Sequence, residues 1–270
     1  MPGASQPRFA FGENWQSFVA TVTKESIAAA ERGLCRLFPD GTLRGCRFLD
    51  IGCGSGITML AAHRLGAASV HGIDLDPASI EAARRLLSAH LDGGAWSLRV
   101  ESVFDLAPDR DGRFEIVYSW GVLHHTGDLW RALEKAAAMV APEGQLAVAL
   151  YRRTPMCRFW RLEKRYYAAA SPAAQSVLRA LYQAAYFAGL VAAGRSPARY
   201  VAGYSARGMA WRYDVHDWLG GYPYESTEPR TVGNALERLG FSLERVFERK
   251  ARAKGLFGTH CDEYVARRRP

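Results

Sequence analysis

Arg47-Phe48-Leu49-Asp50-Ile51-Gly52-Cys53-Gly54-Ser55-Gly56 is the stretch that decides the fold of this 270-residue chain. An apolar run ends at an acid, glycines then alternate with small residues, and helical spacing begins after them. This order predicts a strand, a tight turn and a helix start. The turn lets the backbone pass close beneath a ligand, and Asp50 can accept a hydrogen bond from a cationic amine. Since Ile57 stands where a dinucleotide-binding loop has its third glycine, another nucleoside ligand fits better than NAD.

The following residues repeat the alternation of strand and helix. Further strands are predicted at 68–74, 96–101, 114–119 and 144–151, with helices at 58–65, 78–90 and 128–140. Helical crossovers of this length require a parallel sheet that is covered on both faces. Such sheets bind ligands beyond the carboxyl ends of their strands. We therefore predict one rim of candidate residues, made of Asp50, Asp74, Ser102, Ser119 and Tyr151.

The pattern changes after the fifth strand. Residues 154–212 have helical spacing and many aromatic residues, and no strand is predicted before 241–247 and 262–267. The sequence predicts one α/β domain of 270 residues, interrupted by a helical lid. Its expected parts are N-terminal helices (1–46), a cofactor-binding core (47–151), the lid (152–226), and a last helix with two strands (227–270).

Positive charge is concentrated in the lid. The net charge is +8, and residues 152–212 carry eleven Lys and Arg residues against one acid, Glu163. This local excess is larger than that of the whole chain, so the remainder is slightly acidic. The basic segment favours an anionic partner.

Cysteine usage and hydropathy indicate the cellular compartment in which the protein is expected. The five cysteines form no C-x-x-C pair and are odd in number, which is typical of reduced thiols. The first twelve residues lack the features of a signal peptide. The longest apolar run, 184–194, is shorter than the roughly 20 residues of a membrane span. We therefore expect a soluble cytoplasmic protein.

Three stretches together, Phe48–Gly56, Gly72–Asp76 and Phe114–His125, resemble the class I S-adenosylmethionine-dependent methyltransferases in order, spacing and residue type. The resemblance covers residues 48–151 closely and the last two strands loosely. It implies a Rossmann-like, doubly wound, mostly parallel seven-stranded sheet with a helical insertion after the fifth strand. It also implies S-adenosyl-L-methionine as cofactor, with no metal.

The resemblance assigns the first strands to the methionine and ribose parts of the cofactor. The backbone of Gly52, Cys53 and Gly54 would approach the methionine part, and Asp50 would organise its ammonium. Asp74, at the end of the next strand, would accept from both ribose hydroxyls. The alternative is that Asp50 caps the loop backbone and Asp74 caps the next helix.

Later positions are matched to adenine and to the methyl group. Leu75 would pack on the adenine face. Ser102 stands where the family often has Asp, and with Val103 it would contact the adenine edge. Ser119 and Trp120 would meet the methionine end.

Two histidines and an arginine are candidates for the acceptor side. His124 and His125 follow the fourth strand, and a neutral imidazole with an ordinary pKa of about 6.5 suits a general base. Alternatively, one donates to a carbonyl while the other packs near adenine. The Arg152 guanidinium could hold a carboxylate or phosphate of the acceptor, or belong to a solvated basic face.

Residues 207–225, in the last part of the predicted lid, interleave aromatic and polar residues, and Gly220-Gly221 permits a sharp turn toward the site. Aromatic walls with a few polar groups are typical of small-molecule pockets, so His216 and Tyr222 are candidate catalytic residues. This stretch and Ser119–Thr126 resemble signatures of a small-molecule branch of the family. His260 is expected to close the same pocket or to lie in a surface turn.

The sequence predicts methyl transfer by direct displacement to a small-molecule acceptor, anionic or aromatic, with assistance from a general base. The nucleophile, oxygen, nitrogen or carbanion, is left open. An RNA-modifying enzyme is the alternative favoured by the basic segment, although no nucleic-acid partner is expected because no appended RNA-binding module is present. A lipid methyltransferase with peripheral membrane contact through the basic lid, and a non-catalytic cofactor sensor, are further alternatives.

Overall fold

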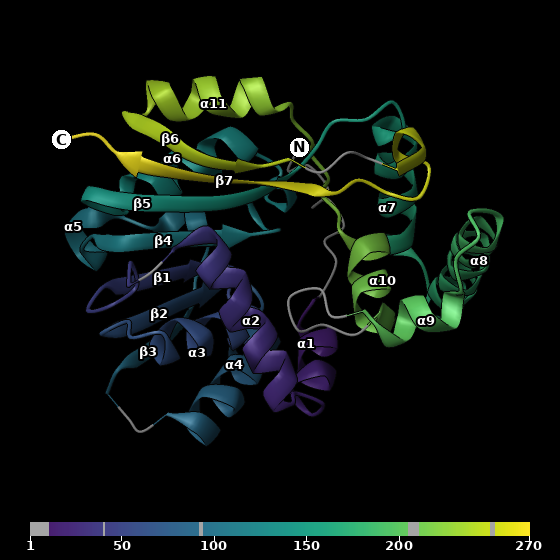
Figure 1. Ribbon diagram of the computed structural model, residues 1–270, viewed down its shortest axis with the longest axis horizontal. Helices are drawn as coiled ribbons and strands as arrows, with labels where there is room; N and C mark the ends of the chain where they lie inside the picture. Colours follow the sequence, from purple (N-terminus) through teal and green to yellow (C-terminus); the bar gives the residue numbers. More distant parts are fainter. Residues whose placement is uncertain (1–10, 40, 92–93, 205–210, 249–251) are drawn as a thin grey trace, which may run out of the picture.

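The computed structural model describes residues 11–39, 41–91, 94–204, 211–248 and 252–270. Strands and helices alternate through the first half (Figure 1), and the elements in chain order are α1 (Gly12–Val19), α2 (Lys24–Leu37), β1 (Arg47–Ile51), α3 (Ile57–Arg64), β2 (Ser69–Asp74), α4 (Pro77–His90), β3 (Trp96–Val100), η1 (Val103–Asp105), α5 (Pro108–Asp111), β4 (Phe114–Trp120), η2 (Leu123–His125), α6 (Leu129–Ala138), β5 (Val140–Tyr151), α7 (Cys157–Ala169), α8 (Pro172–Ala192), α9 (Pro197–Ala202), α10 (Trp211–Gly220), α11 (Pro229–Arg238), β6 (Phe241–Phe247), η4 (Arg252–Gly255) and β7 (Cys261–Arg268).

The strands form one seven-stranded sheet in the order β3-β2-β1-β4-β5-β7-β6. The first five strands run parallel, whereas β7 is antiparallel to both β5 and β6. Strand order reverses between β1 and β4, which is where a doubly wound sheet opens a crevice for a ligand. The predicted fold class, a mostly parallel Rossmann-like sheet, is therefore confirmed.

Strand β1 divides the core between the two faces of the sheet. Phe48 and Leu49 are both fully buried but belong to separate clusters, Phe48 with residues of α2 and α3, and Leu49 with residues of α6. Adjacent side chains of a strand point to opposite faces, so a continuous apolar run needs helices on both sides. This packing fixes Asp50 at the carboxyl end of β1.

The lid helices α7, α8, α9 and α10 lie together beyond one end of the sheet, at the right of Figure 1. They have a core of their own, in which Trp160, Tyr167, Trp211 and Tyr224 are buried. The side chain of Asn14 in α1 donates to Asp217 of α10 at 2.8 Å and to the Tyr213 carbonyl at 3.1 Å. The N-terminal segment is thus joined to the lid.

Two local predictions are corrected. The fifth strand begins at Val140 and not at Gly144, because Val140 pairs with Phe114 before an irregularity shifts the register. The helical spacing predicted to about residue 212 continues further, because Trp211 to Gly220 form a helix, while residues 207–210 lie outside the described residues. Helical spacing of its aromatic residues buries Trp211 and Val215 on one face. In the described parts of the chain, no helix is both long and apolar enough to cross a membrane.

Candidate functional site

A cavity of about 840 Å³ lies between the carboxyl ends of the parallel strands and the lid. Its sheet end is lined by the glycine loop and by residues that follow β1, β2 and β3. Its lid end is lined by aromatic residues of α8, α9 and α10 and by the segment that precedes β7. One continuous space therefore joins the predicted rim to the lid.

The glycine loop forms the floor of the sheet end. The N–H groups of Gly52 and Cys53 both donate to the Ile73 carbonyl, at 2.8 and 3.0 Å, so the loop is held against β2. Gly52 has φ of 76°, and a Cβ there would lie 2.4 Å from the Val122 side chain. Only glycine fits this conformation and this approach without strain. Gly52, Cys53 and Gly54 all line the cavity, as expected from the sequence.

Asp50 and Asp74 end neighbouring strands and face the same cavity. Burial and, to a smaller extent, the nearby Asp74 charge raise the pKa of Asp50 to about 8. Burial also raises the pKa of Asp74 to about 6, although backbone N–H groups oppose this. A buried carboxyl with a raised pKa is stabilised in its charged form by a cationic ligand, so this end of the cavity favours a positive group.

Asp74 is held by the backbone on both carboxyl oxygens. One oxygen accepts from Gly54 N–H at 3.0 Å and the other from Asp76 N–H at 2.9 Å. Each oxygen has a further lone pair for a ligand hydroxyl. The alternative that Asp74 caps the next helix is wrong, because Asp76 does so by accepting from Ala78 N–H at 2.9 Å.

The next wall of the sheet end comes from β2 and β3. Leu75 lines the cavity with 52% of its surface exposed, which is unusual for a large apolar side chain near a core. Ser102 and Val103 lie opposite the glycine loop on η1 and its N-cap, and Ser102 Oγ accepts from Phe104 N–H at 3.3 Å. The three residues matched to adenine thus lie on one cavity.

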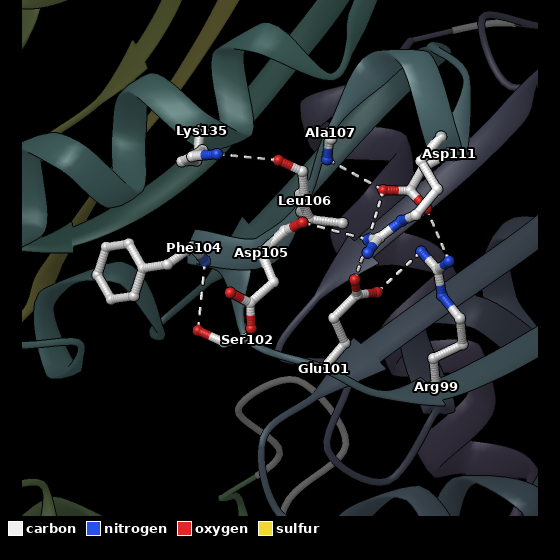
Figure 2. A network of polar contacts seen from close by, with 10 residues as sticks. Arg99, Glu101, Ser102, Phe104, Asp105, Leu106, Ala107, Asp111 and Lys135 are labelled. Carbon is white, nitrogen blue, oxygen red and sulfur yellow. Dashed lines mark hydrogen bonds and ion pairs between the residues drawn. The ribbon is translucent and has the colours of Figure 1, made fainter.

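An ion-pair network supports this wall from behind (Figure 2). Arg99 pairs with Glu101 at 2.9 Å and with Asp111 at 2.7 Å, and Arg110 bridges the same two acids. The Arg110 guanidinium holds the pKa of Asp111 well below its usual range. Lys135 of α6 donates to the Leu106 carbonyl at 3.1 Å. The turn that carries Ser102 is therefore fixed to β3 and α6.

The two residues expected at the methionine end differ in whether their side chains face the cavity. Trp120 lines the cavity, and its indole N–H donates to Glu263 Oε1 at 2.7 Å. Ser119 is fully buried, is absent from the described cavity wall, and donates its hydroxyl to the Ile51 carbonyl at 3.0 Å. The Ser119 side chain points to the neighbouring strand, so its expected contact with a ligand is corrected.

The N-terminal helix supplies a wall that sequence reasoning missed. Phe11 and Trp15 line the cavity, and Trp15 packs on the glycine loop so closely that a Cβ on Gly54 would lie 2.8 Å from its indole. The N–H of Gly12 donates to Asp76 Oδ2 at 2.8 Å. Helical spacing in this segment predicted a helix, but no local signal showed that it lies over the loop.

The adjacent histidines occupy different positions. His125 lines the cavity, and its Nδ1–H donates to the Pro223 carbonyl at 2.7 Å. His124 is fully buried outside the described cavity wall, where its ring stacks on Tyr151 with centroids 3.8 Å apart. Its Nδ1 accepts from Tyr151 N–H at 3.4 Å. Only one of the pair therefore faces the cavity.

The pKa expected for these histidines is also corrected. Burial lowers the pKa of His125 to about 3, because desolvation outweighs the carbonyls that face its ring. Burial, His125 and the Lys164 charge lower the pKa of His124 as well. Both imidazoles are neutral at physiological pH, so neither has the ordinary pKa of about 6.5 that was expected.

Arg152 and His216 do not lie where the sequence predicted. The Arg152 guanidinium pairs with Asp262 at 2.7 Å and with Glu248, away from the described cavity wall. These acids come from the last strand and its neighbour, which the sequence did not place beside Arg152. His216 Nδ1 lies 2.7 Å from the Tyr167 hydroxyl and 3.1 Å from Arg179, within the lid core. Helix α10 turns His216 away while Trp218 lines the cavity.

Tyr222 and His260 line the lid end as expected. The backbone N–H of Arg152 donates to the His260 carbonyl at 3.0 Å, which fixes the segment before β7. Glu263 of the same strand also lines the cavity and pairs with Arg36 of α2. Glu263 was not assigned to the site from the sequence.

Lys164 is a second residue that sequence reasoning missed. It is fully buried, its Nζ lies 3.6 Å from the centre of the Trp218 ring, and it has no hydrogen-bond partner among the described residues. Burial lowers its pKa. The signal was present, because Trp160, Lys164 and Tyr167 fall on one helical face that also carries the lid core.

Sequence similarity to known proteins is concentrated in the part of the chain that forms the sheet end of the cavity. Residues 49–148 match the family described as a methyltransferase domain. A ubiquinone biosynthesis O-methyltransferase of Xanthomonas euvesicatoria pv. vesicatoria is 37% identical over 113 residues, which are 42% of this chain and 46% of that protein. A protein of the same name from Xanthomonas oryzae pv. oryzae is 36% identical over an equal span. The match thus spans less than half the length of these curated relatives.

Solved structures resemble nearly the whole chain at low identity. A magnesium protoporphyrin IX methyltransferase from Synechocystis PCC 6803, with bound SAH, has a TM-score of 0.54 at 17% identity and covers 90% of this chain and 83% of its own. An S-adenosylmethionine dependent methyltransferase from Mesorhizobium loti has a TM-score of 0.53 at 22% identity, with 88% and 98% covered. These likenesses agree with the sheet described above.

Proposed function

We propose that the whole protein is a class I S-adenosylmethionine-dependent enzyme that transfers a methyl group to a small-molecule acceptor, because residues 49–148 match the methyltransferase-domain family. The observation that carries this proposal is the continuity of the cavity, which joins the glycine loop to the aromatic lid end. A donor and an acceptor can therefore lie in one space that the lid separates from bulk water.

The residues of the sheet end fit the donor. When bound, S-adenosylmethionine supplies a methyl group on a positively charged sulfur, which is a good leaving group without further activation. The buried Asp50 carboxyl suits its ammonium, since a cation returns this group to its charged form. The free lone pairs of Asp74 suit the ribose hydroxyls, and the exposed face of Leu75 suits a flat base.

His125 is the residue proposed to contact the nucleophile. Since Nδ1–H is donated to Pro223, Nε2 carries the lone pair of the neutral ring. This lone pair would accept a hydrogen bond from the acceptor hydroxyl or amine. Because burial lowers the pKa of His125, its main contribution is to orient the nucleophile, with proton transfer only as the new bond forms.

The relatives suggest which atom is methylated. Both curated relatives are named O-methyltransferases, so a hydroxyl is the first nucleophile to test. The test follows tritium from methyl-labelled S-adenosylmethionine into a panel of phenols, catechols and arylamines, with wild type and His125→Phe. We expect one acceptor class to be labelled and the rate to fall at least about tenfold in the variant. Failure of the folded protein to bind S-adenosylmethionine would overturn the proposal.

A second candidate is methylation of a lipid-linked acceptor at a membrane surface. The outer face of α7 favours it, because Phe159, Leu162 and Tyr166 are 53%, 69% and 63% exposed beside arginines of the same helix. Apolar side chains among bases are typical of helices that lie on anionic membranes. Flotation with anionic vesicles, compared between wild type and Phe159→Ser/Leu162→Ser, would separate this candidate from the first.

A further inference from the structure

The bases of the lid do not face the cavity. Although residues 152–212 are strongly basic, no arginine or lysine among the described residues of this segment lines the cavity wall. The described bases of the lid are mostly exposed, and they include Arg158, Arg161, Arg165, Arg195, Arg199 and Arg212. The charge that the sequence assigned to an anionic acceptor is therefore on the outside of the lid.

The described cavity wall at the lid end is acidic instead. It contains Asp214, Asp217 and Glu263, and its guanidinium, Arg36, is already paired with Glu263. Asp217 accepts from the Asn14 amide, and Asp214 accepts from the Tyr204 hydroxyl. The Tyr204 hydroxyl is a neutral donor, so it does not cancel the charge of Asp214. An anionic acceptor would be repelled here, while a cation would be attracted.

Aromatic rings gather one helical turn from Asp214, and one of them, Tyr204, donates its hydroxyl to this carboxylate. Trp211 lies at the centre of the group, with ring centroids 4.8 Å from Tyr186, 5.5 Å from Tyr200 and 5.4 Å from Tyr204. The rings are tilted or edge-on to one another, so they do not stack face to face. All four also line the cavity.

Hydrogen bonds fix the rings in place. The Tyr186 hydroxyl donates to that of Tyr200 at 2.9 Å, and the Trp211 indole N–H donates to Gln183 at 3.3 Å. The group thus draws on α8, α9, α10 and the turn after α9, which lie together in Figure 1. Fixed aromatic walls beside a carboxylate are the arrangement that binds alkylated ammonium groups.

One ring of this group, that of Tyr200, already contacts a cation on the side away from the cavity. The Arg195 guanidinium lies 5.8 Å from the centre of the Tyr200 ring but is absent from the described cavity wall. The cavity side of these rings is therefore a separate surface. Its charge comes from Asp214, which also raises the pKa of Tyr182 after the larger effect of burial.

Resting on the proposed function, we infer that the acceptor carries a cationic amine and that this amine binds against the cavity side of four aromatic rings and one carboxylate of the lid. This wall, hereafter the aromatic cage, is made of Tyr186, Tyr200, Tyr204, Trp211 and Asp214. The acceptor then spans the cavity, with its amine in the cage and its nucleophile near the sheet end.

A pair of probes that differ in charge tests this inference. Choline and its neutral carbon analogue 3,3-dimethylbutan-1-ol have nearly the same shape, and their binding is measured by Trp fluorescence and ligand-observed NMR on protein saturated with S-adenosylhomocysteine. We expect choline to bind about tenfold more tightly than the neutral alcohol, because only the charged probe gains from the rings and the carboxylate. Equal binding of the two probes would overturn the inference.

Variants of the aromatic cage test where choline binds. Asp214→Asn keeps the shape of its side chain and removes the charge, whereas Trp211→Phe keeps a smaller aromatic ring. Each is expected to weaken choline binding about three- to tenfold without changing that of the neutral alcohol. The matched control is Phe159→Ala, an exposed lid ring outside the cavity, which should leave the choline affinity unchanged. Loss of choline binding in the control, or full retention in both cage variants, would contradict the cage.

The two proposals fail in different ways. If S-adenosylhomocysteine binds but choline has no preference over the alcohol, the cage is wrong and methyl transfer stands. If the folded protein does not bind S-adenosylhomocysteine, methyl transfer is wrong, and the comparison of choline binding between wild type and the two cage variants still reports on the cage.

Discussion

The sheet end of the cavity is built from backbone and buried carboxylates, whereas the lid end is built from aromatic rings on helices that pack on one another. Gly52 and Asp50 are fixed by one strand and the turn that follows it. The aromatic cage instead needs segments from α8 to α10, whose faces are set only when the lid has formed. The structure of the sheet end is therefore determined locally, whereas that of the lid end is determined by tertiary packing.

If ligand binding at the sheet end depends on backbone geometry, Gly52→Ala should have the largest effect on stability and on ligand affinity. Positive φ costs a side chain about 1–2 kcal/mol, and the contact with Val122 adds ~1–3 kcal/mol. We expect a loss of about 3 kcal/mol in urea unfolding and no detectable binding of S-adenosylhomocysteine.

Two controls sharpen this prediction. Gly52→Ala/Val122→Ala removes the clash but keeps the positive φ, so it should recover only part of the stability. Gly233→Ala, in α11 with its nearest neighbour 3.9 Å away, should be neutral or slightly stabilising. Equal effects of Gly52→Ala and Gly233→Ala would show that the loop geometry does not matter.

Asp50→Asn should separate binding from stability. Without its charge, affinity for S-adenosylhomocysteine should fall about 100-fold, or ~2.7 kcal/mol, by calorimetry. Because the folded-state pKa of about 8 exceeds the ordinary 3.8, wild-type stability falls as pH rises from 3.8 towards 8. The variant lacks this loss and should be more stable than wild type at pH 8, by at least about 1 kcal/mol. Parallel stability profiles from pH 5 to 8 would contradict the burial of this carboxyl.

Arg152→Gln tests whether this arginine is structural. It leaves the fully buried Asp262 without its ion pair, so we expect a loss of about 2 kcal/mol in urea unfolding and unchanged affinity for S-adenosylhomocysteine. Arg153→Gln is the control, since this exposed neighbour lies 3.9 Å from an equally exposed acid and should change stability by less than ~0.5 kcal/mol. A large change in ligand affinity for Arg152→Gln would show that Arg152 takes part in ligand binding.

The smallest effect is expected at Lys164. Because burial lowers its pKa, the unfolded chain binds this proton more tightly, and wild-type stability should rise with pH on the alkaline side of neutrality. Lys164→Met/Glu163→Gln removes both members of this buried pair of opposite charges, so it should stabilise the protein by ~1 kcal/mol at pH 7 and flatten that rise. Thermal melts from pH 6 to 9 measure this, with the exposed Lys24→Met as control. A less stable variant throughout this range would show that the cation supports the lid.

The sequence predicted the sheet and most of its ligand-facing edge because these features repeat along the chain. An apolar strand followed by glycines and an acid determines its own geometry, so Asp50, Asp74 and Leu75 were found at the cavity. Ser119 was the exception, since its side chain points to Ile51. The direction of a side chain at a strand end depends on one residue of register, which composition does not specify.

The lid was harder to predict because charge composition does not tell which way a helix faces. Eleven bases suggested an anionic acceptor, but the described ones lie outside the cavity wall. His124 and His125 differ only in which side of η2 each occupies. The contact between Asn14 and Asp217 joins residues 203 positions apart, so no local pattern contains it.

The central claim is that the sheet end binds the donor of a methyl group. Calorimetric titration of S-adenosylhomocysteine into wild type, Asp74→Ala and the exposed control Asp109→Ala tests it most directly. The account predicts micromolar affinity for wild type and control, and a loss of at least about 50-fold in Asp74→Ala, since the ribose hydroxyls lose their acceptor. A wild-type protein that is folded by circular dichroism and binds neither S-adenosylhomocysteine nor S-adenosylmethionine would contradict it.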